Sequence, residues 1–378
     1  MKKLTALILS LAIVLFSLPF ASADNDAPIV DVPSYILIER ETGTVLCENN
    51  SHEQLAPASV TKIMTLLLIA EALDDGRLSL DDTIVASTNA SQMGGSQIYL
   101  RENEQMSCED MLKSVIIASA NDAAVALAEH LYGSVDSFVE KMNQRATELG
   151  MNDTCFKNCT GLPAQGHVTS AYDISLMSRE LLKHDIIRQY TTVWMDSVRD
   201  GEFGLTNTNR LVRFYEGTTG LKTGFTTEAM YCMSASAERD GMELICVIMK
   251  APTSDDRFEA AKSLLNYGFS NYALIDVTTS ESLPDVPVKL GVESTVPVEL
   301  SSGGKILIDK KLKSEIQTEL ELDEMVDAPV EKGQKLGELH FVASGSEIAT
   351  VDIVAAQDVY KLGWFDIFTR LLGNFFTS

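Results

Sequence analysis

The spacing of hydrophobic and polar residues predicts a different structure for successive parts of the chain. Alternating runs, typical of strands, occur at 34–49 and at 230–237 and 242–250, with turn sequences between them. The segments in between have the apolar content or spacing of helices, which we expect at 59–73, 109–132, 134–149, 172–186 and 256–269. Strands at both ends of a helical middle predict an α/β (α+β) domain, which we place at residues 24–277.

The pattern changes after Pro284. Short alternating runs, separated by Pro and Gly, occupy residues 286–290, 296–300, 305–309, 339–342 and 348–354. Short strands with regular turns are typical of a small all-β domain, which we place at residues 285–360. A chain of 378 residues is long enough to form two such domains.

The first residues have the pattern of an export signal. Lys2 and Lys3 precede an apolar run at 4–16, and residues 21–23 read Ala-Ser-Ala, the small-x-small pattern of a cleavage site. We therefore predict a signal peptide at residues 1–23 and a protein exported to the outer face of the cytoplasmic membrane or the cell wall. The alternative is an uncleaved membrane anchor.

Residues 361–378 form a third kind of pattern. Eight large apolar residues fall on one half of a helical wheel: Trp364, Phe365, Ile367, Phe368, Leu371, Leu372, Phe375 and Phe376. The segment is shorter than the roughly 20 apolar residues that a membrane-spanning helix needs. It predicts an amphipathic helix that lies in the membrane surface, although a helix docked on its own protein has the same pattern.

The net charge of the chain and the spacing of its histidines argue against some classes of function. The chain has 30 basic and 54 acidic residues, a net charge of −24, which argues against nucleic-acid binding. The five histidines are scattered, and we expect no metal site and no cofactor. Cys232 and Cys246 flank a predicted turn, so they either lie near each other or are buried as free thiols.

Residues 59–62, Ser-Val-Thr-Lys, place a hydroxyl and an amine three residues apart. On a helix these residues share one face, so the lysine can reach the serine oxygen. A serine becomes a good nucleophile when a base accepts its proton, and burial favours the neutral amine that can act as this base. Alternatively, Ser59 only caps a helix after Pro57. A second Ser-x-x-Lys, at 302–305, lies in a predicted β-turn.

Two further short motifs carry polar groups suited to acyl transfer. Residues 119–121, Ser-Ala-Asn, interrupt an apolar helical stretch with groups that can relay a proton and hold a carbonyl. A helix–helix turn with local capping has the same appearance, and residues 87–89 fit the pattern too. Residues 222–224, Lys-Thr-Gly, can bind a carboxylate and let a peptide approach as an added strand, or they form an ordinary strand beside a glycine turn.

In this order the three motifs are far more specific than any one of them. They resemble the serine DD-carboxypeptidase family of penicillin-binding proteins, peptidase family S11. The resemblance covers almost the whole chain after residue 23. It is carried by residues 56–62, 119–124, 158–163, 167–173, 220–225, 257, 264–269 and 329–337.

The resemblance implies a catalytic domain of the serine β-lactamase/transpeptidase type and a hydrolase that removes the terminal D-alanine from peptidoglycan stem peptides. In that reaction Ser59 is the nucleophile, Lys62 is the general base, and Ser119 assists proton transfer. The implied substrate-binding residues are Asn121, Lys222, Thr223, Gly224, Phe225 and Arg257. The backbone N–H groups of Ser59 and Phe225 would form the oxyanion hole.

The resemblance also implies that β-lactam antibiotics acylate Ser59. Two alternatives are a β-lactamase of the same fold and an inactive peptidoglycan-binding module. Class A β-lactamases use a glutamate acting through water, and its usual context is not found in this sequence.

Overall fold

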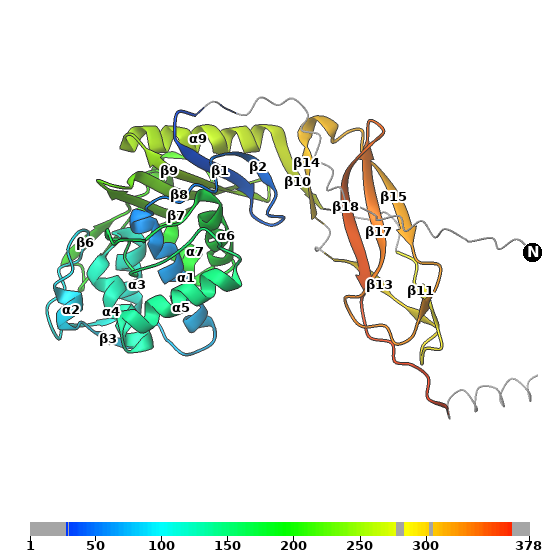
Figure 1. Ribbon diagram of the computed structural model, residues 1–378, viewed down its shortest axis with the longest axis horizontal. Coiled ribbons are helices and arrows are strands. Elements are labelled where there is room, and N and C mark those ends of the chain that lie inside the picture. Colours follow the sequence, from blue (N-terminus) through cyan, green and yellow to red (C-terminus); the bar gives the residue numbers. More distant parts are fainter. Residues whose placement is uncertain (1–27, 29, 277–282, 302–304, 365–378) are drawn as a thin grey trace, which may run out of the picture.

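A computed structural model describes residues 28, 30–276, 283–301 and 305–364 (Figure 1). The expected signal peptide and nearly all of the expected C-terminal helix lie outside these ranges. Within the described residues no helix is both long and apolar enough to cross a membrane.

The first domain is built on a five-stranded sheet in which every pairing is antiparallel. The strand order is β2-β1-β9-β8-β7, so the two predicted strand pairs meet in one sheet. The strands are β1 (Ser34–Glu39), β2 (Val45–Asn49), β7 (Thr218–Thr226), β8 (Met230–Arg239) and β9 (Met242–Ala251). Because β7 pairs only with β8, it forms one edge of the sheet.

Each face of this sheet is covered by helices. Figure 1 shows α9 (Ser254–Asn271) along one face and helices α1 to α7 on the opposite face. Neighbouring residues of β9 alternate between the two cores: Cys246 packs with α9, and Val247 packs with the helical cluster. The helices of this cluster are α1 (Lys62–Asp74), α2 (Thr88–Ser91), α3 (Cys108–Ile117), α4 (Asn121–Tyr132), α5 (Val135–Glu148), α6 (Ala171–Leu181) and α7 (Asp185–Thr191).

Short elements complete the domain. They are the 3-10 helix η1 (Ala58–Thr61), the helix α8 (Leu211–Phe214), and two hairpins, β3 (Thr83–Val85) with β4 (Gln105–Ser107) and β5 (Met195–Val198) with β6 (Phe203–Thr206). Serine and threonine caps begin α3, α5, α6 and α9: Ser107, Ser134, Ser170 and Thr253 each accept a bond from a backbone N–H three residues later. In contrast, α4 begins after Ala120 with no side-chain cap.

Two helices that were predicted to be continuous are each divided in the structure. The helix expected over 109–132 is divided into α3 and α4 by residues 118–120, where Ser119 has a positive φ of 62°. A non-glycine residue in this region cannot continue a right-handed helix. The helix expected over 172–186 ends at Leu181, and α7 begins at Asp185.

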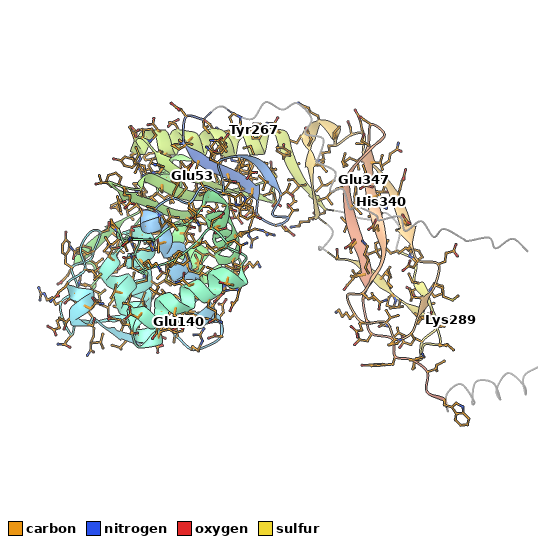
Figure 2. All side chains as sticks on the ribbon, viewed as in Figure 1. Glu53, Glu140, Tyr267, Lys289, His340 and Glu347 are labelled. Atoms are coloured by element: carbon orange, nitrogen blue, oxygen red, sulfur yellow. The ribbon has the colours of Figure 1, made fainter. Side chains whose placement is uncertain are left out.

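The second domain is all-β, as predicted. A four-stranded sheet has the order β13-β18-β17-β15, and a three-stranded sheet has the order β12-β11-β16. Its elements are β11 (Val286–Lys289), β12 (Thr295–Val296), β13 (Val298–Leu300), η2 (Lys310–Leu312), β15 (Gln317–Leu322), β16 (Val326–Asp327), β17 (Lys335–Ala343) and β18 (Ser346–Ala355). Figure 2 shows His340 and Glu347 in this domain, where His340 Nδ1 lies within hydrogen-bonding distance of Glu347 Oε2, at 2.9 Å.

A short sheet joins the two domains. Strand β10 (Tyr272–Asp276), which directly follows α9, pairs antiparallel with β14 (Lys305–Asp309). Lys305 Nζ lies 3.0 Å from a carboxylate oxygen of Glu41, and Lys310 Nζ donates to the carbonyl oxygen of Phe269 at 2.6 Å.

All six cysteines are free thiols. Cys232 and Cys246 do not pair, because Cys232 packs in the helical core and Cys246 in the core under α9, on the other face of the sheet. Among the residues that the structure covers, no cluster of three or more His, Cys, Asp or Glu side chains could hold a metal ion.

Candidate active site

Three motifs that are far apart in the sequence meet between the edge strand β7 and the helical cluster. Ser59 lies on η1, directly before Lys62 begins α1, and Asn121 begins α4. Lys62 Nζ contacts both Ser59 Oγ, at 3.1 Å, and Asn121 Oδ1, at 2.5 Å. Gly224 of β7 packs against the same turn, since a Cβ at this position would lie 2.9 Å from Ser59 N.

The Lys62 amine has three polar partners, and their chemistry determines its orientation. Besides Ser59 Oγ and Asn121 Oδ1, Nζ contacts the carbonyl oxygen of Thr160 at 2.7 Å. The amide and carbonyl oxygens can only accept hydrogen bonds, whereas the serine hydroxyl can also donate. A neutral amine has two N–H donors and one lone pair. When the two oxygens take both donors, the lone pair faces the Ser59 hydroxyl.

Burial favours this neutral amine. The Lys62 side chain is fully buried, and burial lowers its pKa to about 7, although Cys159 and Asp122 act in the opposite direction. A substantial fraction of Lys62 is therefore uncharged near neutral pH. Ser59 itself is half-buried, so part of this residue remains accessible from the surface.

The acceptor at Thr160 is supplied by a turn that Asn158 organises. Asn158 Oδ1 accepts from the backbone N–H groups of Thr160 and Gly161, while Nδ2 donates to the carbonyl of Leu162. Gly161 has a φ of 84°, and a Cβ there would lie 1.8 Å from the carbonyl oxygen of Ala58. Only glycine lets this turn come close enough to η1 to reach Lys62.

His167 connects the same turn region to η1. Its Nδ1 accepts from the Lys157 backbone N–H at 2.9 Å, so its Nε2–H must donate to Thr61 Oγ1, 2.8 Å away. Burial, together with the charge of Lys157, lowers the pKa of His167 to about 4. His167 is therefore a neutral structural link near the site.

Ser119 occupies the break between α3 and α4. Its side chain is buried, and Oγ has no hydrogen-bond partner within the described part of the protein. Its positive φ and that of Ala58, 47°, are both sparsely populated for these residues. Strained residues of this kind persist where the surrounding structure holds them, often at functional sites.

Asn121 and Asp122 also hold the loop at residues 94–100. Asn121 Nδ2 donates to the carbonyl of Gly94 at 2.7 Å, which fixes Oδ1 toward Lys62. The Asp122 carboxylate accepts from the backbone N–H groups of Ile98 and Leu100. This loop therefore serves to orient Asn121, a function that its glycine-rich sequence alone does not reveal.

The Lys-Thr-Gly segment lies on the edge strand. Lys222 is buried, and its Nζ donates to the Thr223 carbonyl at 3.2 Å. Burial, followed by the charges of Lys62 and Arg257, lowers the pKa of Lys222 well below its usual value. The Thr223 hydroxyl donates to Thr208 Oγ1 at 2.8 Å.

The Arg257 side chain contacts backbone groups beside the site, and the Phe225 side chain contacts another aromatic ring. The Arg257 guanidinium is buried and donates to the carbonyl oxygens of Gly224 and Cys232, both at 3.2 Å. It thus binds the backbone behind the Lys-Thr-Gly segment. The Phe225 side chain is exposed and stacks on Tyr231, with ring centroids 4.5 Å apart.

Sequence reasoning missed two groups of the site, the Thr160 carbonyl and the Thr208 hydroxyl. Residues 158–163, which resemble a family motif, gave an indirect signal for the Thr160 carbonyl. Ser87, in the other segment that fits the Ser-x-Asn pattern, caps α2 by accepting from the Ala90 N–H and donates its hydroxyl hydrogen to the Glu129 carboxylate. The decoy at 302–305 falls largely outside the described residues, although Lys305 begins β14.

Comparisons with known proteins agree with the motif pattern. The sequence profile of the family described as D-alanyl-D-alanine carboxypeptidase matches residues 21–253, and that of penicillin-binding protein 5, C-terminal domain, matches residues 277–361. The D-alanyl-D-alanine carboxypeptidase DacF of Bacillus subtilis is 40% identical, with 99% of each chain covered. DacC of Escherichia coli is 32% identical, over 90% of this chain and 87% of its own.

Solved structures show the same similarity in three dimensions. Penicillin-binding protein 5 from Haemophilus influenzae aligns with a TM-score of 0.79 at 30% identity, covering 88% of this chain and 99% of its own. Penicillin-binding protein D2 from Listeria monocytogenes, in its ampicillin-bound form, aligns with a TM-score of 0.59 at 31% identity. It covers 64% of this chain and 98% of its own.

Two adjacent glycines test the role of the 94–100 loop. Gly95 has a φ of 80°, and a Cβ there would lie 2.7 Å from Asn121 Nδ2, whereas a Cβ at Gly94 would meet nothing within 4 Å. We expect Gly95→Ala to lower the free energy of unfolding by about 1–3 kcal/mol, because both the backbone and Asn121 must shift. Gly94→Ala should change it by less than about 0.5 kcal/mol. Equal effects in urea denaturation would contradict the proposed contact.

Proposed function

The chain belongs to the D-alanyl-D-alanine carboxypeptidase family, and from this we propose that it removes the terminal D-alanine from peptidoglycan stem peptides through an acyl-enzyme on Ser59. The observation that carries this proposal is the arrangement at Lys62. Two oxygens that can only accept hydrogen bonds occupy the N–H groups of the neutral amine, leaving its lone pair to the Ser59 hydroxyl.

Acylation follows from this arrangement. Lys62 Nζ accepts the Ser59 proton as Oγ forms a bond to the carbonyl carbon of the penultimate D-alanine. The developing oxyanion is stabilised by the backbone N–H groups of Ser59 and Phe225. The C–N bond then breaks, and the proton passes from Lys62, with the help of Ser119, to the departing D-alanine amine. Water hydrolyses the resulting ester and regenerates Ser59.

Substrate binding uses the groups around this reacting centre. Asn121 Nδ2 has two hydrogens, one of which binds Gly94, and the other is assigned to a substrate carbonyl. The free edge of β7 suits an extended peptide that adds as a strand, with Gly224 permitting close approach. Lys222 and Thr223 bind the terminal carboxylate. Arg257 supports them through its bond to the Gly224 carbonyl.

We also propose that β-lactams acylate the same serine. The ampicillin-bound relative from Listeria monocytogenes, which aligns with 64% of this chain, supports this. A β-lactamase would need a group that activates water for fast deacylation. Among the described residues the hydrogen-bond partners of Lys62 Nζ are Ser59, Asn121 and Thr160, with no carboxylate among them. This favours a peptidase over a β-lactamase, and the intact set of polar contacts favours an enzyme over an inactive binding module.

The placement of the protein completes the proposal. Residues 1–23 are a signal peptide, residues 24–277 the catalytic domain and residues 285–360 the β domain. Residues 361–378 form an amphipathic helix that holds the exported enzyme on the membrane surface. The apolar half of the sequence pattern supports this, as does the substrate, which lies outside the cytoplasm.

Replacing the nucleophile tests the acyl-enzyme directly. Ser59→Ala in residues 24–360 should abolish both D-alanine release from a D-Ala-D-Ala peptide and covalent labelling by a fluorescent penicillin, because no other hydroxyl contacts Lys62 Nζ among the described residues. Ser87→Ala, at the decoy motif, is the matched control and should retain both. Labelling that persists in Ser59→Ala would overturn the assignment. Rapid penicillin turnover without D-alanine release would favour a β-lactamase.

The pKa of Lys62 predicts a pH dependence. Protonation removes the lone pair, so the rate of acylation by penicillin should fall as the pH drops below about 7 and reach a plateau above it. Lys62→Arg, which stays charged, should lower the rate by about 10²–10⁴-fold at neutral pH. Stopped-flow or gel-based labelling from pH 5 to 9 measures this. A flat profile across pH 7 would exclude Lys62 as the base.

Deleting residues 361–378 tests the membrane helix. We expect the truncated protein to move from the membrane fraction to the soluble fraction while D-alanine release is unchanged, because the candidate active-site residues all lie between positions 59 and 257 of the sequence. A second variant, Phe368→Asp with Leu372→Asp, should behave like the deletion, because charges on the apolar half of the helix oppose its insertion into the membrane surface. An unchanged distribution between fractions would exclude this segment as the anchor.

A further inference from the structure

Thr208 contacts the carboxylate-binding strand but belongs to none of the three motifs. It lies between β6 and α8, and its Oγ1 accepts the hydrogen bond of the Thr223 hydroxyl at 2.8 Å. Its backbone N–H donates to the carbonyl of Ile117, two residues before Ser119. Thr208 therefore joins the Ser119 side of the site to the Lys-Thr-Gly side.

Two buried asparagines hold Thr208 in place. Asn207 donates from Nδ2 to the carbonyl of Val193 at 2.8 Å, and Asn209 donates from Nδ2 to the carbonyl of Gly220 at 3.0 Å. Asn207 Oδ1 also accepts from the Asn209 N–H. Both asparagines are buried, whereas Thr208 is half-buried. The segment is thus fixed on both sides, and its middle residue alone presents a hydroxyl to the site.

The direction of the Thr208–Thr223 hydrogen bond must change when an anion binds. A threonine hydroxyl has one hydrogen, and Thr223 gives it to Thr208 in this structure. To donate to a carboxylate, Thr223 needs that hydrogen back. Thr208 can then rotate its own hydrogen toward Thr223 Oγ1, so that the bond between them is kept in the reverse direction. Successive hydroxyl bonds of this kind polarise one another.

We propose that Thr208 is a positioning residue for the terminal carboxylate of the substrate, acting through the Thr223 hydroxyl. This inference rests on the proposed carboxypeptidase function and adds to it a residue that sets the affinity for anionic substrates. Because the hydrogen bond between Thr208 and Thr223 can run in either direction, the Thr223 hydroxyl keeps this bond both with and without the ligand.

The test combines a mutation with a change in the ligand. In Thr208→Val the shape is kept and the hydroxyl is lost, and we expect the second-order rate of acylation by benzylpenicillin to fall about threefold to tenfold. Benzylpenicillin methyl ester lacks the carboxylate charge. The variant and the unaltered protein should therefore react with this ester at equal rates. Such a double cycle isolates the coupling between Thr208 and the carboxylate.

Two further variants and a peptide assay separate positioning from folding. Thr208→Ser keeps the hydroxyl and should restore the rate, and Thr206→Val, at an exposed threonine of β6, should have no effect. With a D-Ala-D-Ala peptide, Thr208→Val should raise KM and leave kcat unchanged, as expected for binding shared by the ground and transition states.

The outcomes distinguish this inference from the proposed function. If Thr208→Val has no effect on benzylpenicillin, or slows the acid and the ester equally, the carboxylate role of Thr208 is wrong. If the unaltered protein neither reacts with benzylpenicillin nor releases D-alanine, the proposed function itself fails.

Discussion

The buried amine of Lys62 is the interaction on which the rest of the site depends. An ammonium group in this position would lose most of its hydration, so burial lowers its pKa to about 7. A neutral amine is a base only if its lone pair faces the hydroxyl, and this requires that both N–H groups be used elsewhere. The first residue of α4 and the turn after Asn158 supply the two acceptors. The fold thus determines the direction of the base as well as its charge.

These acceptors can reach Lys62 because glycines allow unusually close packing. Gly161 lies against the Ala58 carbonyl, Gly224 against Ser59 N, and Gly95 against the Asn121 amide. Each comes from a different segment, so the turn carrying Ser59 is enclosed from several sides. The enclosure also holds Ala58 and Ser119 in sparsely populated backbone conformations, which cost about 1–3 kcal/mol each. The two extensive cores on either face of the sheet offset this cost.

The sequence predicted the parts of this arrangement that depend on side-chain identity. Alternation identified β1, β2, β8 and β9 of the central sheet and short strands of the second domain, and motif order identified the three segments that meet. It did not predict the break at Ser119, because the apolar pattern of residues 115–120 continues through it. It could not identify the Thr160 carbonyl, since every residue has one, nor Thr208, which is close only in three dimensions. The backbone contacts of Arg257 were hidden for the same reason.

The two lysines of the site differ in what an anionic substrate does to them. The pKa of Lys222 is lowered by burial and by the charges of Lys62 and Arg257, so its protonated form is disfavoured before a ligand binds. A carboxylate beside Lys222 acts in the opposite direction and favours its protonated form. At Lys62 the positive charge of Lys222 opposes the negative charge of the carboxylate. Lys222 therefore offsets the tendency of the anion to convert Lys62 to an ammonium, which could not accept the Ser59 proton.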